Sequence, residues 1–189
     1  MTTIQKKTFA LLFGLLLLSG HALAATYEID PAHSSVSFKI RHLVGNVRGG
    51  FDKFSGTIEY DPSSEAASSL KVSIDAASIN TGNEGRDKHL KSPDFFDTEK
   101  FSEIAFVSKK VDPEKKKLTG DLTLHGVTKE VEIDYTVGGI AQDPKGKTHL
   151  GGSGQVTLNR SDFGIAYDPS GAMIGRDVKV ELEIEALAQ

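Results

Sequence analysis

The sequence predicts an all-β fold in which an antiparallel sheet surrounds one apolar interior. Two observations support this prediction. Apolar and polar residues alternate along most of the chain, as in residues 34–43 and 178–186, so each segment has one buried face and one solvated face. Five of the six prolines follow an aspartate. Such a pair marks a turn or a strand end, because the aspartate closes an Asx-turn and the proline fixes φ.

Eight candidate strands lie between these turn signals, after a short lead-in segment at residues 27–29. Each is rich in β-branched or aromatic residues and is bounded by glycine, proline or aspartate. The expected strands are residues 34–43, 47–60, 70–76, 103–111, 118–124, 131–140, 150–158 and 178–186.

The second of these segments favours a closed barrel over a two-sheet sandwich. Residues 47–60 are long for a sandwich strand, and they contain Gly49, Gly50 and Gly56, which permit a bulge or a sharp bend at a barrel corner. The predicted fold class is therefore an eight-stranded antiparallel β-barrel with one short helix. A barrel of this size is either filled by its own side chains or holds one small ligand.

The helix is expected just after residue 83, in the one stretch that breaks the strand pattern. Asn83 is the expected N-cap, acidic residues occupy the first turn, Lys88 and Lys91 occupy the last turn, and Pro93 follows. One helix beside a barrel suggests a lid or a plug.

The N-terminal residues have the order of a secretory signal peptide. Lys6 and Lys7 precede an apolar run at residues 9–18, and Ala22-Leu23-Ala24 follows. We expect cleavage after Ala24, because the apolar run is too short to span a bilayer as a helix. Residues 1–24 are thus the predicted signal peptide and residues 25–189 one barrel domain, located in the periplasm.

Composition excludes several classes of function. Loss of Lys6 and Lys7 moves the formal charge from −4 to about −6, which argues against nucleic acid or an anionic membrane surface as the main partner. The chain has no cysteine, so disulfides, thiol catalysis and thiolate metal sites are absent.

Several segments resemble the YceI-like polyisoprenoid-binding family of bacterial periplasmic proteins. They are DPAHSSVSFKIRHL at 30–43, VRGGFDKFSGTIEYD at 47–61, TGNEGRDKHLKSPDFFDTEKFSEIAF at 81–106 and NRSDFGIAYD at 159–168. The resemblance covers essentially the whole mature chain. It implies a lipocalin-like barrel with an elongated apolar cavity, an isoprenoid or other amphiphilic lipid as the guest, and a homodimer as the assembly.

The inward phase of the strands supplies most of the candidate ligand-binding residues. Strands of ~10 residues at ~3.3 Å each, tilted by ~40°, give a lumen about 25 Å tall, which suits a chain-like molecule and rejects polar metabolites. His42 falls in this phase as a polar group at one end, and Phe163 is expected at the opposite mouth with Tyr167. Arg86 and His89 share a helix face that either caps a head group or is simply solvated. The predicted ligand-binding residues are Val36, Phe38, Ile40, His42, Phe54, Ile58, Val72, Ile74, Arg86, His89, Phe106, Leu122, Ile133, Tyr135 and Phe163.

Motifs for catalysis are weak. The mature histidines are far apart without metal-binding spacing, and Gly152-Ser153-Gly154 lacks the spacing of a nucleophile elbow, so we predict no metal, no cofactor and no reaction. The basic run at residues 115–117 is expected to be a solvated hairpin tip. Two alternatives remain: a filled barrel that acts in stress or protein interaction, and an enzyme in which His42 or His89 is the base and Asp87 or Asp94 its partner.

Overall fold

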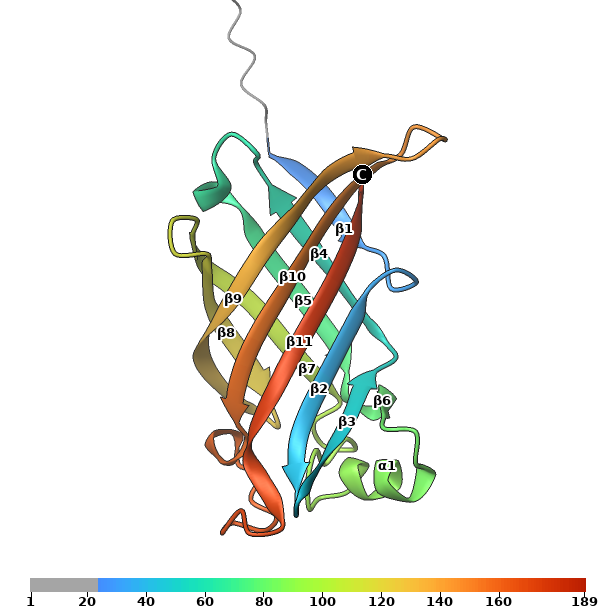
Figure 1. Cartoon of the computed structure of the whole chain (residues 1–189), viewed down its shortest axis with the longest axis vertical. Coiled ribbons are helices and arrows are strands. Elements are labelled where there is room, and N and C mark those ends of the chain that lie inside the picture. Colours follow the sequence, from blue (N-terminus) through green and yellow to red (C-terminus); the bar gives the residue numbers. More distant parts are fainter. Residues whose placement is uncertain (1–23) are drawn as a thin grey trace, which may run out of the picture.

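Eleven antiparallel strands form an elongated barrel in the computed structural model, which describes residues 24–189 (Figure 1). Residues 1–23, which make up nearly all of the predicted signal peptide, lie outside the described residues. The strands are β1 (Ala25–Ile29), β2 (Ser35–His42), β3 (Gly45–Phe51), β4 (Phe54–Tyr60), β5 (Ser69–Asp75), β6 (Ile79–Asn80), β7 (Glu103–Asp112), β8 (Lys117–Leu124), β9 (Val127–Gln142), β10 (Thr148–Asn159) and β11 (Ile174–Ala188).

Eight of these strands close into a ring, which confirms the predicted eight-stranded antiparallel barrel. The order is β1-β4-β5-β7-β8-β9-β10-β11, and β11 returns to β1 through the pairs Ala188 with Tyr27 and Ala186 with Ile29. The other half of β11 pairs with β2, which carries β3 and then β6. The two ends of the barrel share strands such as β10 and β11, but β1 completes the wall at the end that holds the C-terminus, whereas β2, β3 and β6 complete it at the opposite end (Figure 1).

The expected strand at 47–60 is interrupted at Asp52 and Lys53, which was not predicted. The facing strand is interrupted too, by a one-turn 3-10 helix, η2 (Ala76–Ser78), between β5 and β6. The two breaks supply each other's backbone partners: Asp52 N–H donates to the Ser78 carbonyl at 3.1 Å, and Asp75 N–H donates to the Lys53 carbonyl at 3.0 Å. Two adjacent strands can bend at the same height because these backbone groups pair with each other across the break.

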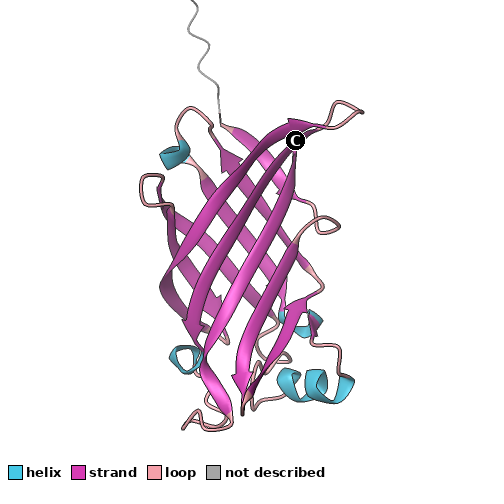
Figure 2. Ribbon diagram, in the orientation of Figure 1, coloured by secondary structure: helices cyan, strands magenta, loops and turns pink. Residues whose placement is uncertain are grey.

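The predicted helix is present as α1 (Glu84–Lys91), with the Asn83 side chain accepting a hydrogen bond from Arg86 N–H at 2.9 Å. It lies beside β6 at the end of the barrel opposite the C-terminus (Figure 1). The other helical segments are the single turns η1 (Glu65–Ala67), η2 and η3 (Arg160–Phe163), and Figure 2 shows that strands make up nearly all of the wall. Among the described residues, no helix has the length and apolar character needed to cross a membrane.

Buried side chains form three clusters along the barrel. One lies at the α1 end and includes Phe95, Leu124 and Phe163. A second, with Phe106 and Ile133, belongs to the sheet of β7, β8 and β9. The third, around Tyr27 and Ala186, lies where β11 closes onto β1. Apolar side chains therefore line the inside of the wall along the length of the barrel.

Candidate functional site

The barrel encloses a cavity of about 660 Å³, lined by inward side chains from the strands of the ring, from β2 and β3, and from α1. Leu150 and Leu158 of β10 both line it. They are eight residues apart in one strand, so the cavity follows the strand for ~26 Å. Its walls are almost wholly aliphatic and aromatic. This elongated, apolar shape agrees with the lumen expected from the sequence.

All but one of the predicted ligand-binding residues line this cavity. The exception is Phe163, which was expected at a mouth. It is only 2% exposed and packs in the cluster with Phe95 and Leu124, while its carbonyl accepts a hydrogen bond from His125 Nδ1 at 3.2 Å. Phe163 is corrected to a core residue, whereas Tyr167, expected beside it, does line the cavity.

Glycines in β10 keep part of the lumen open. Gly151, Gly152 and Gly154 all line the cavity. A Cβ atom at Gly154 would lie 3.2 Å from side-chain carbons of Ile133 and Leu182, which is closer than most real contacts. Side chains at Gly152 and Gly154, which pair with the inward residues Ile184 and Leu182, would occupy the space of a guest or push the wall outward. The glycine-rich segment that was expected to start a strand therefore also shapes the cavity.

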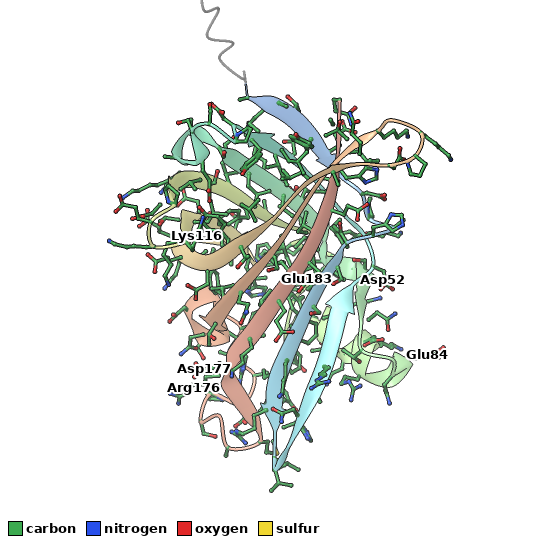
Figure 3. All side chains as sticks on the ribbon, turned by 45° about the horizontal axis from the view of Figure 1, so that its top comes forward. Asp52, Glu84, Lys116, Arg176, Asp177 and Glu183 are labelled. Carbon is green, nitrogen blue, oxygen red and sulfur yellow. The ribbon has the colours of Figure 1, made fainter. Side chains whose placement is uncertain are left out.

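A polar group closes one end of the cavity, and sequence reasoning missed most of it. Glu65 of η1 accepts hydrogen bonds from the Tyr135 hydroxyl at 2.5 Å and from Lys116 Nζ at 3.0 Å. The hydrogen bond from Tyr135 lowers the pKa of Glu65, and burial together with that carboxylate raises the pKa of Tyr135. Lys116 is exposed in the turn between β7 and β8, as expected, and its ammonium lies 5.6 Å from the centre of the Tyr135 ring. In Figure 3, Lys116 projects from the side of the barrel opposite Glu84 of α1.

The other end carries Arg86 and His89 of α1, both of which line the cavity as predicted. Arg86 donates to the Thr81 hydroxyl at 2.7 Å and to the Thr81 carbonyl at 2.9 Å, so part of its hydrogen-bonding capacity fastens the start of the helix. The His89 ring packs edge-on against Phe95 and Tyr167, with centroid distances of 5.0 and 5.2 Å.

The residues named for the alternative enzyme are only partly brought together. His89 Nε2 lies 2.8 Å from Asp94 Oδ2, and both side chains are about half exposed. Asp87 instead accepts from Thr81 N–H at 3.0 Å and from the Thr81 hydroxyl, so its proposed pairing with a histidine is wrong. The His89 and Asp94 pair therefore fastens the end of α1 near the surface, at the end of the cavity that His89 lines.

Arg160 organises the loop at the α1 end, and no pattern in the sequence predicts this role beyond the segment NRSDFGIAYD. Its side chain is buried, at 4% exposure, and donates to four carbonyls: Ile165 at 2.8 Å, Gly175 at 2.9 Å, Asp168 at 3.0 Å and Ile174 at 3.2 Å. Burial lowers the pKa of this guanidinium. The arginine therefore folds residues 164–175 onto the barrel.

The carboxylate of Asp168 completes this loop. It accepts hydrogen bonds from the N–H groups of Met173 and Ile174, both at 2.8 Å, and these bonds together with the Ser170 hydroxyl lower the pKa of Asp168 to about 2. The loop in turn brings Tyr167 and Met173 to the cavity. Arg160 and Asp168 thus shape the cavity end through the backbone.

The model of the YceI-like domain family matches residues 27–186. The chain belongs to the YceI-like family. Among curated relatives, a UPF0312 protein of Pseudomonas savastanoi pv. phaseolicola is 41% identical over 186 residues, covering 94% of this chain and 97% of the relative. A UPF0312 protein of Staphylococcus aureus is 40% identical over 165 residues, covering 84% and 95%.

Solved structures of the YceI-like family share the fold. The crystal structure of Burkholderia cenocepacia BcnA superposes with a TM-score of 0.73 at 25% identity, covering 83% of this chain and 98% of that one. The Campylobacter jejuni YceI protein superposes with a TM-score of 0.71 at 36% identity, covering 79% and 90%. A polyisoprenoid binding domain from Saccharophagus degradans, at 18% identity and a TM-score of 0.67, has the same fold. These structures therefore confirm the barrel fold of this chain.

Proposed function

We propose that this YceI-like protein is a periplasmic carrier or sequestering protein that holds one elongated amphiphilic lipid of the isoprenoid class in its barrel. The observation that carries the proposal is the apolar cavity of about 660 Å³. Its volume falls in the range of ligand sites, about 300–1,000 Å³. The fold shared with the S. degradans polyisoprenoid binding domain supports the isoprenoid class.

The distribution of polar groups fits an amphiphile better than a plain hydrocarbon. The middle of the cavity offers no partner for a polar group, so a polar guest atom there would lose its hydrogen bonds to water. Among the polar side chains that line the cavity, Glu65 and Tyr135 lie at one end and Arg86 and His89 at the other. A guest with one polar head and one long tail places its head at an end.

The filled barrel fits these observations poorly. A barrel stabilised only by its own packing fills its interior to the density of an organic crystal, with few voids larger than a water molecule. The inward glycines Gly152 and Gly154 would be poor choices for such a core, since each removes packing area.

The decisive experiment is to identify what the protein carries. Mature protein purified gently from its host is extracted with organic solvent, and the released molecules are identified by mass spectrometry against a mock purification. We expect close to one lipid with a long unbranched or isoprenoid tail per barrel. Recovery of no stoichiometric lipid would contradict the carrier proposal.

The periplasmic location rests on the predicted signal peptide and has its own test. The first strand begins at Ala25, directly after the predicted cleavage site. Intact-mass analysis of the periplasmic fraction should therefore give a chain that starts at or near Ala25. A membrane-bound product that retains Met1 to Ala24 would contradict this location.

A further inference from the structure

Exposed apolar side chains gather at the α1 end of the barrel. Six large apolar residues are markedly exposed in residues 24–189, and four of them, Leu43, Val44, Tyr167 and Met173, lie at this end. Single exposed apolar residues need no explanation, but a cluster beside a cavity does. Tyr167 and Met173 also line the cavity, as does the exposed His42, so the cavity reaches the surface here.

The turn between β2 and β3 has unusual chemistry. His42 pairs with Gly45, so Leu43 and Val44 form a two-residue loop. Such loops favour glycine, asparagine or aspartate, because at least one residue must adopt a positive φ. Here Leu43 has φ +50° and Val44 is fully exposed. The turn thus combines backbone strain with two apolar side chains that are exposed at the surface.

This turn is held rigidly against the neighbouring loop. Leu43 N–H donates to the Met173 carbonyl at 2.7 Å. The Arg41 guanidinium bridges the two segments, donating to the carbonyls of Leu43 at 2.9 Å, Ala172 at 3.3 Å and Gly171. We refer to residues 41–46 and 171–174 together as the tip. Because its backbone is fastened, the tip presents its apolar side chains at little further entropic cost.

A row of cations crosses the outer wall just behind the tip. Arg48 of β3 pairs directly with Lys39 of β2, and Lys39 pairs directly with Lys179 of β11. Like charges at directly opposed positions destabilise a sheet. Asp177 and Glu181 flank Lys179 along β11, yet none of the three cations forms an ion pair within residues 24–189. Lys39 is three residues from His42, so the row lies ~10 Å behind the tip.

We propose that the tip docks on a lipid bilayer that contains anionic lipids. Leu43, Val44 and Met173 enter the interfacial region, and the row of Arg48, Lys39 and Lys179 faces the lipid phosphates. Interfacial binding requires this arrangement, in which apolar side chains enter the membrane and cations lie behind them at the level of the phosphates. The net negative charge of the chain is no obstacle, because attraction to head groups acts within about a Debye length, ~8 Å, of the surface.

A protein partner fits the tip less well than a bilayer. Three apolar side chains fall far short of the roughly 20–30 residues per side of a stable protein interface. The docked orientation also sets the exposed lining residues His42, Tyr167 and Met173 against the membrane. If the proposed carrier function holds, a lipid guest passes between bilayer and cavity there without crossing water; the docking itself does not depend on that function.

The test measures co-sedimentation of the mature protein with vesicles of phosphatidylglycerol and phosphatidylcholine in equal parts. The main variant is Leu43→Gly combined with Val44→Ser, a residue pair that suits such a turn, so it should fold at least as stably as the wild type. We expect its vesicle affinity to fall roughly tenfold or more, because two apolar side chains that the bilayer would bury are lost.

A second variant tests the row of cations. Arg48→Gln should lower the vesicle affinity roughly fivefold and weaken the dependence of that affinity on salt. The matched controls, Val107→Ser and Ile140→Ser, remove exposed apolar groups elsewhere and should bind like the wild type.

Three outcomes would overturn the docking proposal: no binding to these vesicles, tip variants that bind like the wild type, or a dimer that the tip variant dissociates while vesicles are not bound. The last outcome would assign the tip to a second copy of the chain. Mass spectrometry of extracted lipid, run on the same samples, separates this result from the carrier proposal. Tip variants should still contain lipid that was loaded during expression. A barrel that never contains lipid would refute the carrier proposal, and the docking proposal would then be judged from the vesicle data alone.

Discussion

The two ends of the cavity are built by different means. At one end, side chains bond to side chains: Tyr135 and Lys116 meet the carboxylate of Glu65 from strands and turns far apart in the sequence. At the α1 end, one buried side chain bonds to backbone: Arg160 gathers four carbonyls of residues 165–175. At the first end, the polar contacts join side chains of the barrel without determining its backbone. At the second end, one arginine determines the conformation of the loop.

This difference predicts unequal tolerance to change. A side-chain pair that is partly exposed can lose one member and recover hydrogen bonds from water. Four carbonyls arranged around a buried guanidinium cannot do so without opening the loop. The α1 end is also where the cavity reaches the surface, so damage there should alter access as well as stability.

The largest effect is expected from Arg160→Met, which keeps the length of the side chain but removes its donors. Unpairing buried carbonyls should destabilise the protein by about 3–5 kcal/mol, or about 10 °C in Tm. Urea unfolding followed by circular dichroism measures this. The control is Arg176→Met, whose exposed guanidinium donates only to the Pro169 carbonyl and should cost at most about 1 kcal/mol. Equal losses in the two variants would remove the contrast between the ends.

Val72→Phe tests whether one hollow joins the two ends. Val72 lines the cavity midway along β5, paired with Gly56 and Phe106. In a close-packed core the added ring would cost ~1–3 kcal/mol, but in a hollow it takes the place of the guest. We expect lipid binding to fall tenfold or more while the stability of the lipid-free protein changes little.

Lys71→Ala is the control for Val72→Phe, since Lys71 is the exposed neighbour in the same strand. It should change neither lipid binding nor stability by much. If Val72→Phe lowers the melting temperature of the lipid-free protein by several degrees and lipid binding persists, the usable cavity does not extend to β5. The two ends would then belong to separate pockets.

Tyr135→Phe probes the Glu65 end and should cost about 1 kcal/mol at neutral pH, because Lys116 remains to pair with Glu65. The pKa of Glu65 is lowered in the folded protein. Its stabilising contribution is therefore present above its ordinary pKa, near 4.5, and is lost as the pH falls through the lowered value. The stability difference between wild type and variant, measured by urea unfolding from pH 7 to pH 3, should shrink below about pH 4.5. A difference that stays constant over this range would show that the charge of Glu65 does not matter.

Asp168→Asn is expected to lower the stability at neutral pH and to make the stability less sensitive to acid. The folded pKa of Asp168 is about 2, below its ordinary 3.8, so its contribution is present above pH 3.8 and is lost as the pH falls toward 2. The wild-type melting temperature should therefore fall more steeply between pH 4 and 2 than that of the variant. Asp177→Asn removes an exposed carboxylate from β11 and should retain the wild-type slope. Parallel curves for wild type and Asp168→Asn would contradict the role of this carboxylate in holding the loop.

Local patterns in the sequence were sufficient to predict most of the wall. Alternation of apolar and polar residues located each long strand to within a few residues, and the cap at Asn83 located α1. The Asp-Pro pairs were read correctly as turns, since Asp30 and Asp61 each accept a hydrogen bond from the N–H two residues later. The same alternation selected residues that line the cavity, because a period of two assigns a face. Cleavage after Ala24, dimer formation and the identity of the guest stay predictions.

What the sequence by itself determined about this protein was thus the barrel, its apolar inner face and its family. The tertiary structure decided which distant groups meet. It placed Glu65 against Tyr135, 70 positions away, broke two neighbouring strands at the same height, turned Phe163 into the core and set Leu43 against Met173. The physical reason is that periodicity reports which side of a strand is dry, while contacts across a barrel depend on register and closure, which no short segment encodes.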